Sequence, residues 1–235
     1  MLENNIIALV ITFAISLTWL RLNDFFAHRG WIESHLSRKI IHIGTGPLFV
    51  FCWLLFDENP INKYLAALVP FAFTVQFFLI GIGLIRDEAS VKAMSRSGDR
   101  REVLRGPLYY GIIFILLTLF YWKNSPIGII ALMLMCGGDG LADIFGRKWG
   151  KRRLFWNNGK SWAGSFGMLL GGWILSIFVI WLFIRVDIFL PPIQYFILPI
   201  SIIAIIGTLV ESLPLKDLDN ITVTASALLV GHLFF

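Results

Sequence analysis

The fold of this 235-residue chain is indicated by one stretch, Gly137-Gly138-Asp139-Gly140-Leu141-Ala142-Asp143. The stretch continues the apolar run 129–136 without a break and leads directly into a basic loop at residues 147–153. In a helix, the side chains of Asp139 and Asp143 would lie on one face, one turn apart. Carboxylates at membrane depth are costly, and those that occur there commonly belong to a functional site. We therefore expect a membrane protein whose chemistry depends on this acidic pair.

The composition of the whole chain also indicates an integral membrane protein. Apolar residues make up 57% of the chain and charged residues 15%, and the apolar residues form long runs, as in membrane-spanning helices. The formal net charge of +5 does not indicate a nucleic-acid-binding protein, because the basic residues lie in short loops beside the apolar runs. Cys52 and Cys136 lie inside apolar runs and are interpreted as packing residues, not as a disulfide.

The apolar runs predict an all-α fold, a polytopic bundle of about eight transmembrane helices that forms a single domain over residues 1–235. The first run lacks a basic leader and a cleavage site, so we interpret it as a permanent helix. The helices are expected at residues 5–22, 39–56, 64–85, 107–122, 126–145, 161–186, 195–213 and 221–235.

Loop charge predicts the orientation of these helices. The loops 21–39, 86–105, 147–160 and 214–220 contain 17 of the 20 Lys and Arg residues. The other three lie in the alternate loops. Because basic loops stay on the cytoplasmic side of a membrane, we expect both termini outside and the chemistry at the cytoplasmic face.

Asp139 and Asp143, with glycines around them, fit a Mg²⁺ ion that also holds a nucleotide. Mg²⁺ is commonly bound by one or two carboxylates, and phosphate oxygens and water complete its shell. The glycines would let the backbone approach the phosphates closely. The alternative is a helix kink whose carboxylates pair with Lys or Arg of neighbouring helices. Farther along, Glu211 ends a long apolar run and is followed by Asp219, so these acids would either bind a second Mg²⁺ ion or lie in the interface.

The basic loop after the acidic pair is a candidate phosphate site. Lys160 and Ser161 stand at the expected start of the next helix, and anions are favoured at helix N-termini. A Walker A loop is excluded, because Leu154 stands where that motif requires glycine. The same helix has a small-residue face that predicts close helix packing, formed by Gly164, Gly167 and Gly171.

Arg38, Lys39 and His42 form a smaller group at the end of another expected helix, where Arg38 and His42 share a face. The group either faces phosphate, or His42 is a packed or interfacial residue. No spacing among the histidines supports a zinc site.

Five motifs then resemble a known family when they are taken together. They are Arg38-Lys39-Ile40-Ile41-His42, Arg101-Glu102-Val103-Leu104-Arg105-Gly106-Pro107-Leu108, Gly138-Asp139-Gly140-Leu141-Ala142-Asp143, Asn158-Gly159-Lys160-Ser161-Trp162-Ala163-Gly164-Ser165 and Val210-Glu211-Ser212-Leu213-Pro214. With the spacing from Asp139 through Ala142 and Gly146 to Gly150, they resemble the CTP-dependent polyprenol kinase superfamily, and within it the phytol kinases. The resemblance extends over residues 38–222. Ala163 stands where dolichol kinases carry an acid, which favours the phytol branch, whereas Leu218 departs from the family pattern before Asp219.

The resemblance and the residue chemistry together define an expected site. The catalytic residues would be Asp139, Asp143, Lys160, Arg38 and His42. The nucleotide would be bound by Gly138, Gly140, Ala142, Gly146, Arg147, Gly150, Lys160, Ser161, Gly164, Lys39, Arg101 and Glu102. The metal ligands would be Asp139, Asp143, Glu211 and Asp219. The general base stays open among Asp139, Asp143, Glu102, Glu211 and His42.

The resemblance implies a kinase that phosphorylates an isoprenoid alcohol (phytol, geranylgeraniol or farnesol) with CTP or another nucleoside triphosphate and Mg²⁺, and whose product feeds tocopherol synthesis. We expect it in a bacterial, cyanobacterial type of membrane, because no transit peptide is visible. Two other functions stay open. A CDP-lipid synthase would use CTP and Mg²⁺ to transfer CMP to phosphatidic acid, and a small cation-coupled transporter would use the acids as a relay.

Overall fold

The computed structural model describes residues 2–95, 97–215 and 218–235, and the chain forms two compact units. The first unit contains residues Met1–Ile41 and Leu48–Phe120, and the second contains His42–Pro47 and Tyr121–Phe235. The middle of one long helix thus belongs to the second unit, although the rest of that helix belongs to the first. Whether the two units make up the single domain expected from the sequence stays a prediction.

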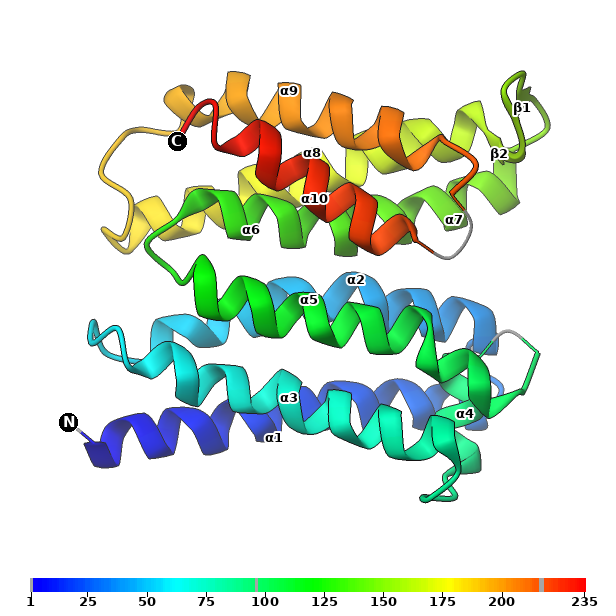
Figure 1. Ribbon diagram of the computed structural model, residues 1–235, viewed down its shortest axis with the longest axis horizontal. Coiled ribbons are helices and arrows are strands. Elements are labelled where there is room, and N and C mark those ends of the chain that lie inside the picture. The colour runs from blue at the N-terminus through cyan, green and yellow to red at the C-terminus, as the bar shows by residue number, and fades with distance from the viewer. Residues whose placement is uncertain (1, 96, 216–217) are drawn as a thin grey trace. The chain divides into compact units, whose positions relative to one another are not determined.

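The first unit is a group of helices around α3 (Figure 1). Helix α3 packs against α1 and α5 and against the short helix η2. Asn5 near the start of α1 donates a hydrogen bond of 2.8 Å to Asp57, which fastens α1 to the loop before α3. The elements are α1 (Leu2–His28), α2 (Ser34–Cys52), η1 (Trp53–Leu55), α3 (Asn62–Ile82), α4 (Glu88–Met94), η2 (Arg100–Leu104) and α5 (Gly106–Phe120).

The second unit is built around one buried segment that runs from α6 into a π-helical turn. Every residue from 127 to 138 is buried, because α8 and α10 pack along this segment and α9 contacts its π-helical turn. A helix that is apolar all round is expected in such a central place. The elements are α6 (Pro126–Met133), the π-helical turn η3 (Leu134–Gly138), α7 (Asp139–Trp149), β1 (Arg153–Leu154), β2 (Asn157–Ser161), α8 (Trp162–Arg185), α9 (Gln194–Glu211) and α10 (Asp219–Gly231).

Glycines let α8 lie directly on the backbone of η3 and α7. A Cβ atom at Gly167 would lie 2.6 Å from the carbonyl oxygen of Leu141, and one at Gly137 would lie 2.9 Å from the carbonyl oxygen of Gly171. Neither distance is tolerated between real atoms, so only glycine permits this separation. The close-packing role predicted for the glycine face of this helix is therefore confirmed.

Seven continuous helical segments of the described residues are long and apolar enough, by length and composition, to cross a membrane. Some of these segments join successive elements, as Pro126–Trp149 joins α6, η3 and α7. The chain is therefore a multi-pass membrane protein, and its all-α class is confirmed. The expected helix at 221–235 forms as α10, but it has only 13 residues and is about 20 Å long. A membrane core is about 30 Å thick, so α10 is too short to be counted with the seven.

A short helix and a β-hairpin were not expected from the sequence. Helix α4 forms in the charged loop between α3 and η2, where Asp87 caps it by accepting a hydrogen bond of 2.9 Å from Ser90 N. Strands β1 and β2 pair antiparallel with Leu154 opposite Asn157, so that the turn between them contains two residues. This β-hairpin joins α7 to α8.

Candidate active site

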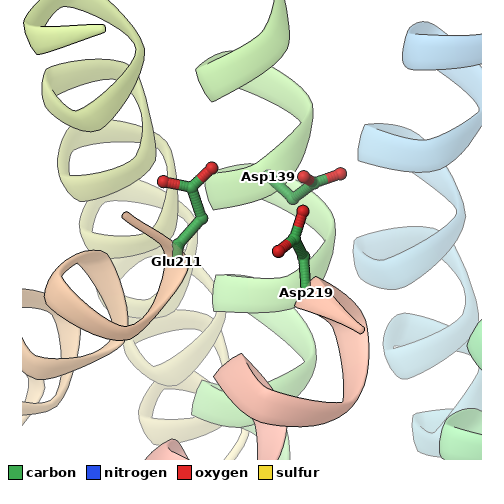
Figure 2. Close-up of side chains that lie close together, drawn as sticks. All are labelled: Asp139, Glu211 and Asp219. Carbon is green, nitrogen blue, oxygen red and sulfur yellow. The ribbon is translucent and has the colours of Figure 1, made fainter. Parts of the chain in front are cut away.

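Three carboxylates from three helices converge in the second unit. Asp139 is the first residue of α7, Glu211 is the last residue of α9, and Asp219 is the first residue of α10. Figure 2 shows the three side chains close together, and one ligand oxygen of each lies within 4.8 Å of the others. We call these three residues the carboxylate cluster. Such a group of oxygen ligands suits a hard divalent cation.

Lys160 extends from β2 into the carboxylate cluster. Its Nζ atom contacts Glu211 Oε1 and lies 3.1 Å from Asp219 Oδ2. Burial by itself would lower the pKa of Lys160, but the negative charges of Glu211 and Asp219 outweigh it, and the pKa lies above its ordinary value. The ammonium is therefore charged at neutral pH and balances part of the cluster's negative charge.

Glu211 is the most deeply buried member of the cluster, with 2% of its side chain exposed. Its Oε1 atom contacts Lys160, whereas its Oε2 atom is buried and has no hydrogen-bond partner among the described residues. Buried polar atoms without a partner are rare, and each one calls for an explanation. A cation bound by the cluster would supply the missing partner.

His42 connects α2 to the start of the cluster. Its Nε2 atom lies 3.0 Å from the carbonyl oxygen of Met135 and 3.3 Å from Asp139 Oδ2. Both neighbours are hydrogen-bond acceptors, so Nε2 carries the hydrogen. Met135 belongs to the π-helical turn, in which backbone hydrogen bonds reach the fifth residue instead of the fourth. His42 thus holds both the turn and the carboxylate that follows it.

Asp143, the other member of the expected acidic pair, has a different environment. Both of its carboxylate oxygens lie 3.2 Å from Nε of Arg147, four residues later on α7. The structure therefore joins Asp139 to Glu211 and Asp219, which are distant in sequence, and pairs Asp143 with its neighbour on the same helix. A role for Asp143 as a metal ligand stays a prediction.

Most of the small residues expected at the nucleotide serve helix packing. Gly138 faces Met168 of α8, and Gly140 faces Ile43 of α2. Ser161 is buried and caps α8, since its hydroxyl accepts a hydrogen bond of 3.1 Å from Gly164 N. Contacts with a nucleotide stay predictions for all of these residues: Gly138, Gly140, Ala142, Gly146, Arg147, Gly150, Ser161 and Gly164.

Four of the expected site residues belong to the first unit. Arg38 and Lys39 lie on α2, and Arg101 and Glu102 lie on η2. Glu102 accepts hydrogen bonds from the backbone and hydroxyl of Ser97 at 3.2 and 3.0 Å, so it organises its own loop. The proposed contacts of these four residues with the nucleotide stay predictions.

A contact that was not expected fixes the hairpin beside the cluster. The indole Nε1 of Trp156 donates to the carbonyl and hydroxyl oxygens of Ser212 at 3.2 Å, and Asn157 Nδ2 donates to the same carbonyl at 3.0 Å. Ser212 directly follows Glu211. Both residues that form the contact lie in the hairpin that carries Lys160, so the contact sets Lys160 opposite Glu211. No local sequence pattern predicts this contact, because its partners are more than 50 residues apart.

Comparisons with known proteins agree with the motifs that meet at this site. A sequence model described as the cytidylyltransferase family matches residues 2–216. A Glycine max protein named probable phytol kinase 3, chloroplastic, is 38% identical over 99% of this chain and 73% of its own length. A Zea mays protein named probable phytol kinase, chloroplastic, is 37% identical over 100% of this chain and 78% of its own length.

A relative with a different name is similar at the same level. An Arabidopsis thaliana protein named farnesol kinase, chloroplastic, is 41% identical over 88% of this chain and 68% of its own length. No solved structure is significantly similar to the chain. The chain therefore belongs to the cytidylyltransferase family and is a relative of the plant phytol and farnesol kinases.

Proposed function

We propose that this protein is a membrane kinase that transfers the γ-phosphoryl group of CTP to a long-chain isoprenoid alcohol, with phytol as the first candidate acceptor. The observation that carries the proposal is that Asp139, Lys160 and Glu211, from three separate phytol-kinase-like motifs, meet at one site. The names of the relatives support the acceptor, since proteins named phytol kinase and farnesol kinase align with most of the chain.

The carboxylate cluster fits Mg²⁺ as the metal of this reaction. Its three carboxylates offer hard oxygen ligands, and the buried Oε2 atom of Glu211 has no partner among the described residues. When bound, Mg²⁺ supplies positive charge to the donor phosphates and aligns them. Asp139, Glu211 and Asp219 would hold it.

Lys160 has two successive partners in this proposal. Without nucleotide, its ammonium neutralises Glu211 and Asp219. With a divalent cation held by Asp139, Glu211 and Asp219, Lys160 would no longer be needed for that neutralisation, and its ammonium would be repelled outward. Directly before the N-terminus of α8, Lys160 can pair with the phosphoryl group during transfer, where a charged donor stabilises the transition state.

The acceptor alcohol is expected to reach the site from the lipid. Its apolar chain would lie among the membrane helices, and its hydroxyl would lie at the cytoplasmic face, where the basic loops favour placing the site. Phytyl phosphate, the expected product, would feed tocopherol synthesis. The bacterial membrane expected from the sequence gains no support from the comparisons, in which the reported relatives are named chloroplastic.

The fate of a labelled phosphate tests the proposal against its closest rival. Purified protein would receive Mg²⁺, phytol or phosphatidic acid, and CTP labelled at the α- or γ-phosphate, with Asp139→Asn as the inactive control. A kinase places γ-label in a lipid-soluble monophosphate and leaves the α-label in CDP. A cytidylyltransferase, as the family's description suggests, instead places the α-label in the lipid and releases the γ-label in pyrophosphate. The second result would overturn the proposal.

A further inference from the structure

The β-hairpin between α7 and α8 lies where the chain enters and leaves the membrane. The candidate span before it ends at Trp149 and the one after it begins at Trp162. Residues 150–161, which join these two candidate spans, would therefore lie at the membrane surface, at the level of the lipid headgroups. Trp149 and Trp162 are themselves 53% and 54% exposed, as expected for aromatic residues at a membrane interface.

The hairpin carries a concentrated positive charge. Lys148 at the end of α7 and Lys151, Arg152 and Arg153 of the hairpin segment are all exposed. Between Asp143 and Asp187 the sequence contains no acidic residue, and Asp143 is paired with Arg147. The charge of these four cations is therefore not balanced by any acid of their own segment. We call the four cations together with Phe155 the basic hairpin surface.

An exposed apolar ring follows these cations along the chain. Phe155 lies in the two-residue turn between Leu154 and Asn157 and is 87% exposed, whereas its neighbour Leu154 is 1% exposed. An exposed phenylalanine at the tip of a basic hairpin is unsuited to a nucleotide phosphate site, which needs polar groups at its centre. It suits a membrane surface, where cations meet anionic headgroups and an aromatic ring enters the boundary of the acyl chains.

We propose that the basic hairpin surface binds anionic lipid headgroups, with Phe155 inserted between them, and that this contact positions Lys160 in the active site. The positioning part rests on the function proposed above, whereas the lipid contact does not. The lipids would be recognised by charge and depth, since the surface offers several exposed cations together with one exposed aromatic ring.

A chain of contacts joins the lipid-facing tip to the carboxylate cluster. The ring of Phe155 packs edge-on against Trp156 with centroids 4.4 Å apart. Trp156 donates to Ser212, which follows Glu211, and Lys160 lies on the same strand as Asn157, the second residue that contacts Ser212. A hairpin held by lipid keeps these contacts in place. A hairpin without lipid loses part of its support, and the pairing of Lys160 with Glu211 weakens with it.

The test uses the full chain in nanodiscs made of phosphatidylcholine alone or with phosphatidylglycerol added. An environment-sensitive fluorophore attached to a cysteine introduced by Asn158→Cys, at an exposed hairpin position, reports the lipid contact. The wild-type chain, treated with the same fluorophore, measures the background labelling of its two buried cysteines. The double variant Arg152→Gln/Arg153→Gln removes charge from the surface. Arg86→Gln/Lys92→Gln, which removes two exposed cations elsewhere, is the matched control, and Phe155→Ser tests insertion.

We expect a blue shift of the fluorophore and a several-fold rise in phosphoryl transfer when anionic lipid is added, and both effects should fall at high salt. Each cation near an anionic surface contributes about a factor of five in binding, so Arg152→Gln/Arg153→Gln should abolish most of both effects and the control variant should keep them. Phe155→Ser should reduce the blue shift in both kinds of nanodisc.

Three results would overturn the proposal. One is a fluorophore signal that does not change with lipid charge. Another is an equal loss in the control variant. The third is an apparent affinity for CTP that Arg152→Gln/Arg153→Gln weakens equally in both lipids, which would assign these cations to the nucleotide. A lipid-dependent blue shift in a protein without kinase activity would instead refute the proposed function and leave the lipid contact standing.

Discussion

Lys160 Nζ lies 3.1 Å from Asp219 Oδ2, and this ion pair joins strand β2 to the first residue of helix α10. The two residues are separated by 59 positions in the sequence. Their contact places an internal cation at the point where a catalytic cation would bind. A metal ion bound there, as proposed, would compete with the ammonium for the same carboxylates, and this competition can be measured.

Replacing Lys160 should separate metal binding from turnover. In Lys160→Met, the carboxylate cluster loses its internal cation, so we expect tighter binding of Mn²⁺, used as a probe for Mg²⁺, by roughly tenfold. Turnover should fall by roughly 100-fold or more, because the charged donor to the phosphoryl group is gone. Mn²⁺ binding is measured by electron paramagnetic resonance in the absence of nucleotide. Lys92→Met, at an exposed position on α4, is the control, and weaker Mn²⁺ binding in Lys160→Met would contradict the competition.

Asp139→Asn should abolish phosphoryl transfer without unfolding the protein. The substitution keeps the shape of the side chain and its contact with His42, but it removes one negative charge from the cluster. We expect a loss of activity of roughly 100-fold or more, as for the removal of a group that stabilises transition-state charge. Transfer of γ-label measures the activity, and size-exclusion chromatography measures the fold. Near-normal turnover in this variant would rule out the metal assignment.

His42 should act as a positioning residue. His42→Gln retains an N–H donor for the Met135 carbonyl and Asp139, whereas His42→Phe retains only the ring. Support of this kind around a metal site is worth roughly 10- to 100-fold in metal affinity or activity. We therefore expect His42→Phe to weaken Mn²⁺ binding by such a factor and His42→Gln to restore most of it. Equal losses in both variants would show that the imidazole itself is required.

Gly167→Ala should destabilise the second unit. The new methyl group would lie 2.6 Å from the carbonyl oxygen of Leu141, so α8 would have to move away from α7. Overpacking of this kind costs about 1–3 kcal/mol. Gly106→Ala is the matched control, because a Cβ there has no neighbour within 4 Å. Thermal unfolding in detergent compares the two variants, and an unchanged melting temperature for Gly167→Ala would contradict the tight packing.

The sequence predicts the membrane helices well, because their signal is local. Apolar runs and loop charges mark each span without reference to the rest of the chain. The same reasoning overestimates α10, since its apolar residues continue to Phe235 while the helix ends at Gly231. Composition gives the extent of an apolar run but not the residue at which the helix ends. The helical part of this run is the part that packs against α9 and α6 as α10.

The sequence predicts which residue types form the candidate site, but it does not predict which of these residues contact one another. Asp139, Lys160 and Glu211 could each be chosen because an acid or a cation beside an apolar run has to be explained. Helical spacing places Asp143 next to Asp139, but it cannot place Asp219 there, because that contact depends on how α7, α9 and α10 converge. For the same reason, the hydrogen bonds from Trp156 to Ser212 cannot be predicted from a local sequence pattern.

The π-helical turn at Leu134–Gly138 makes the length of its segment as important as its composition. A ring closed at the fifth residue contains one residue more than a ring closed at the fourth. The wider ring takes up this residue, so deleting one residue there would restore a regular α-helix and leave the helix beyond it facing nearly the same way. The same deletion within the regular part of α6 would instead rotate everything beyond it by about 100°, and Asp139 would turn away from Glu211 and Asp219. The site therefore depends on the number of residues that precede Asp139 as well as on the acids themselves.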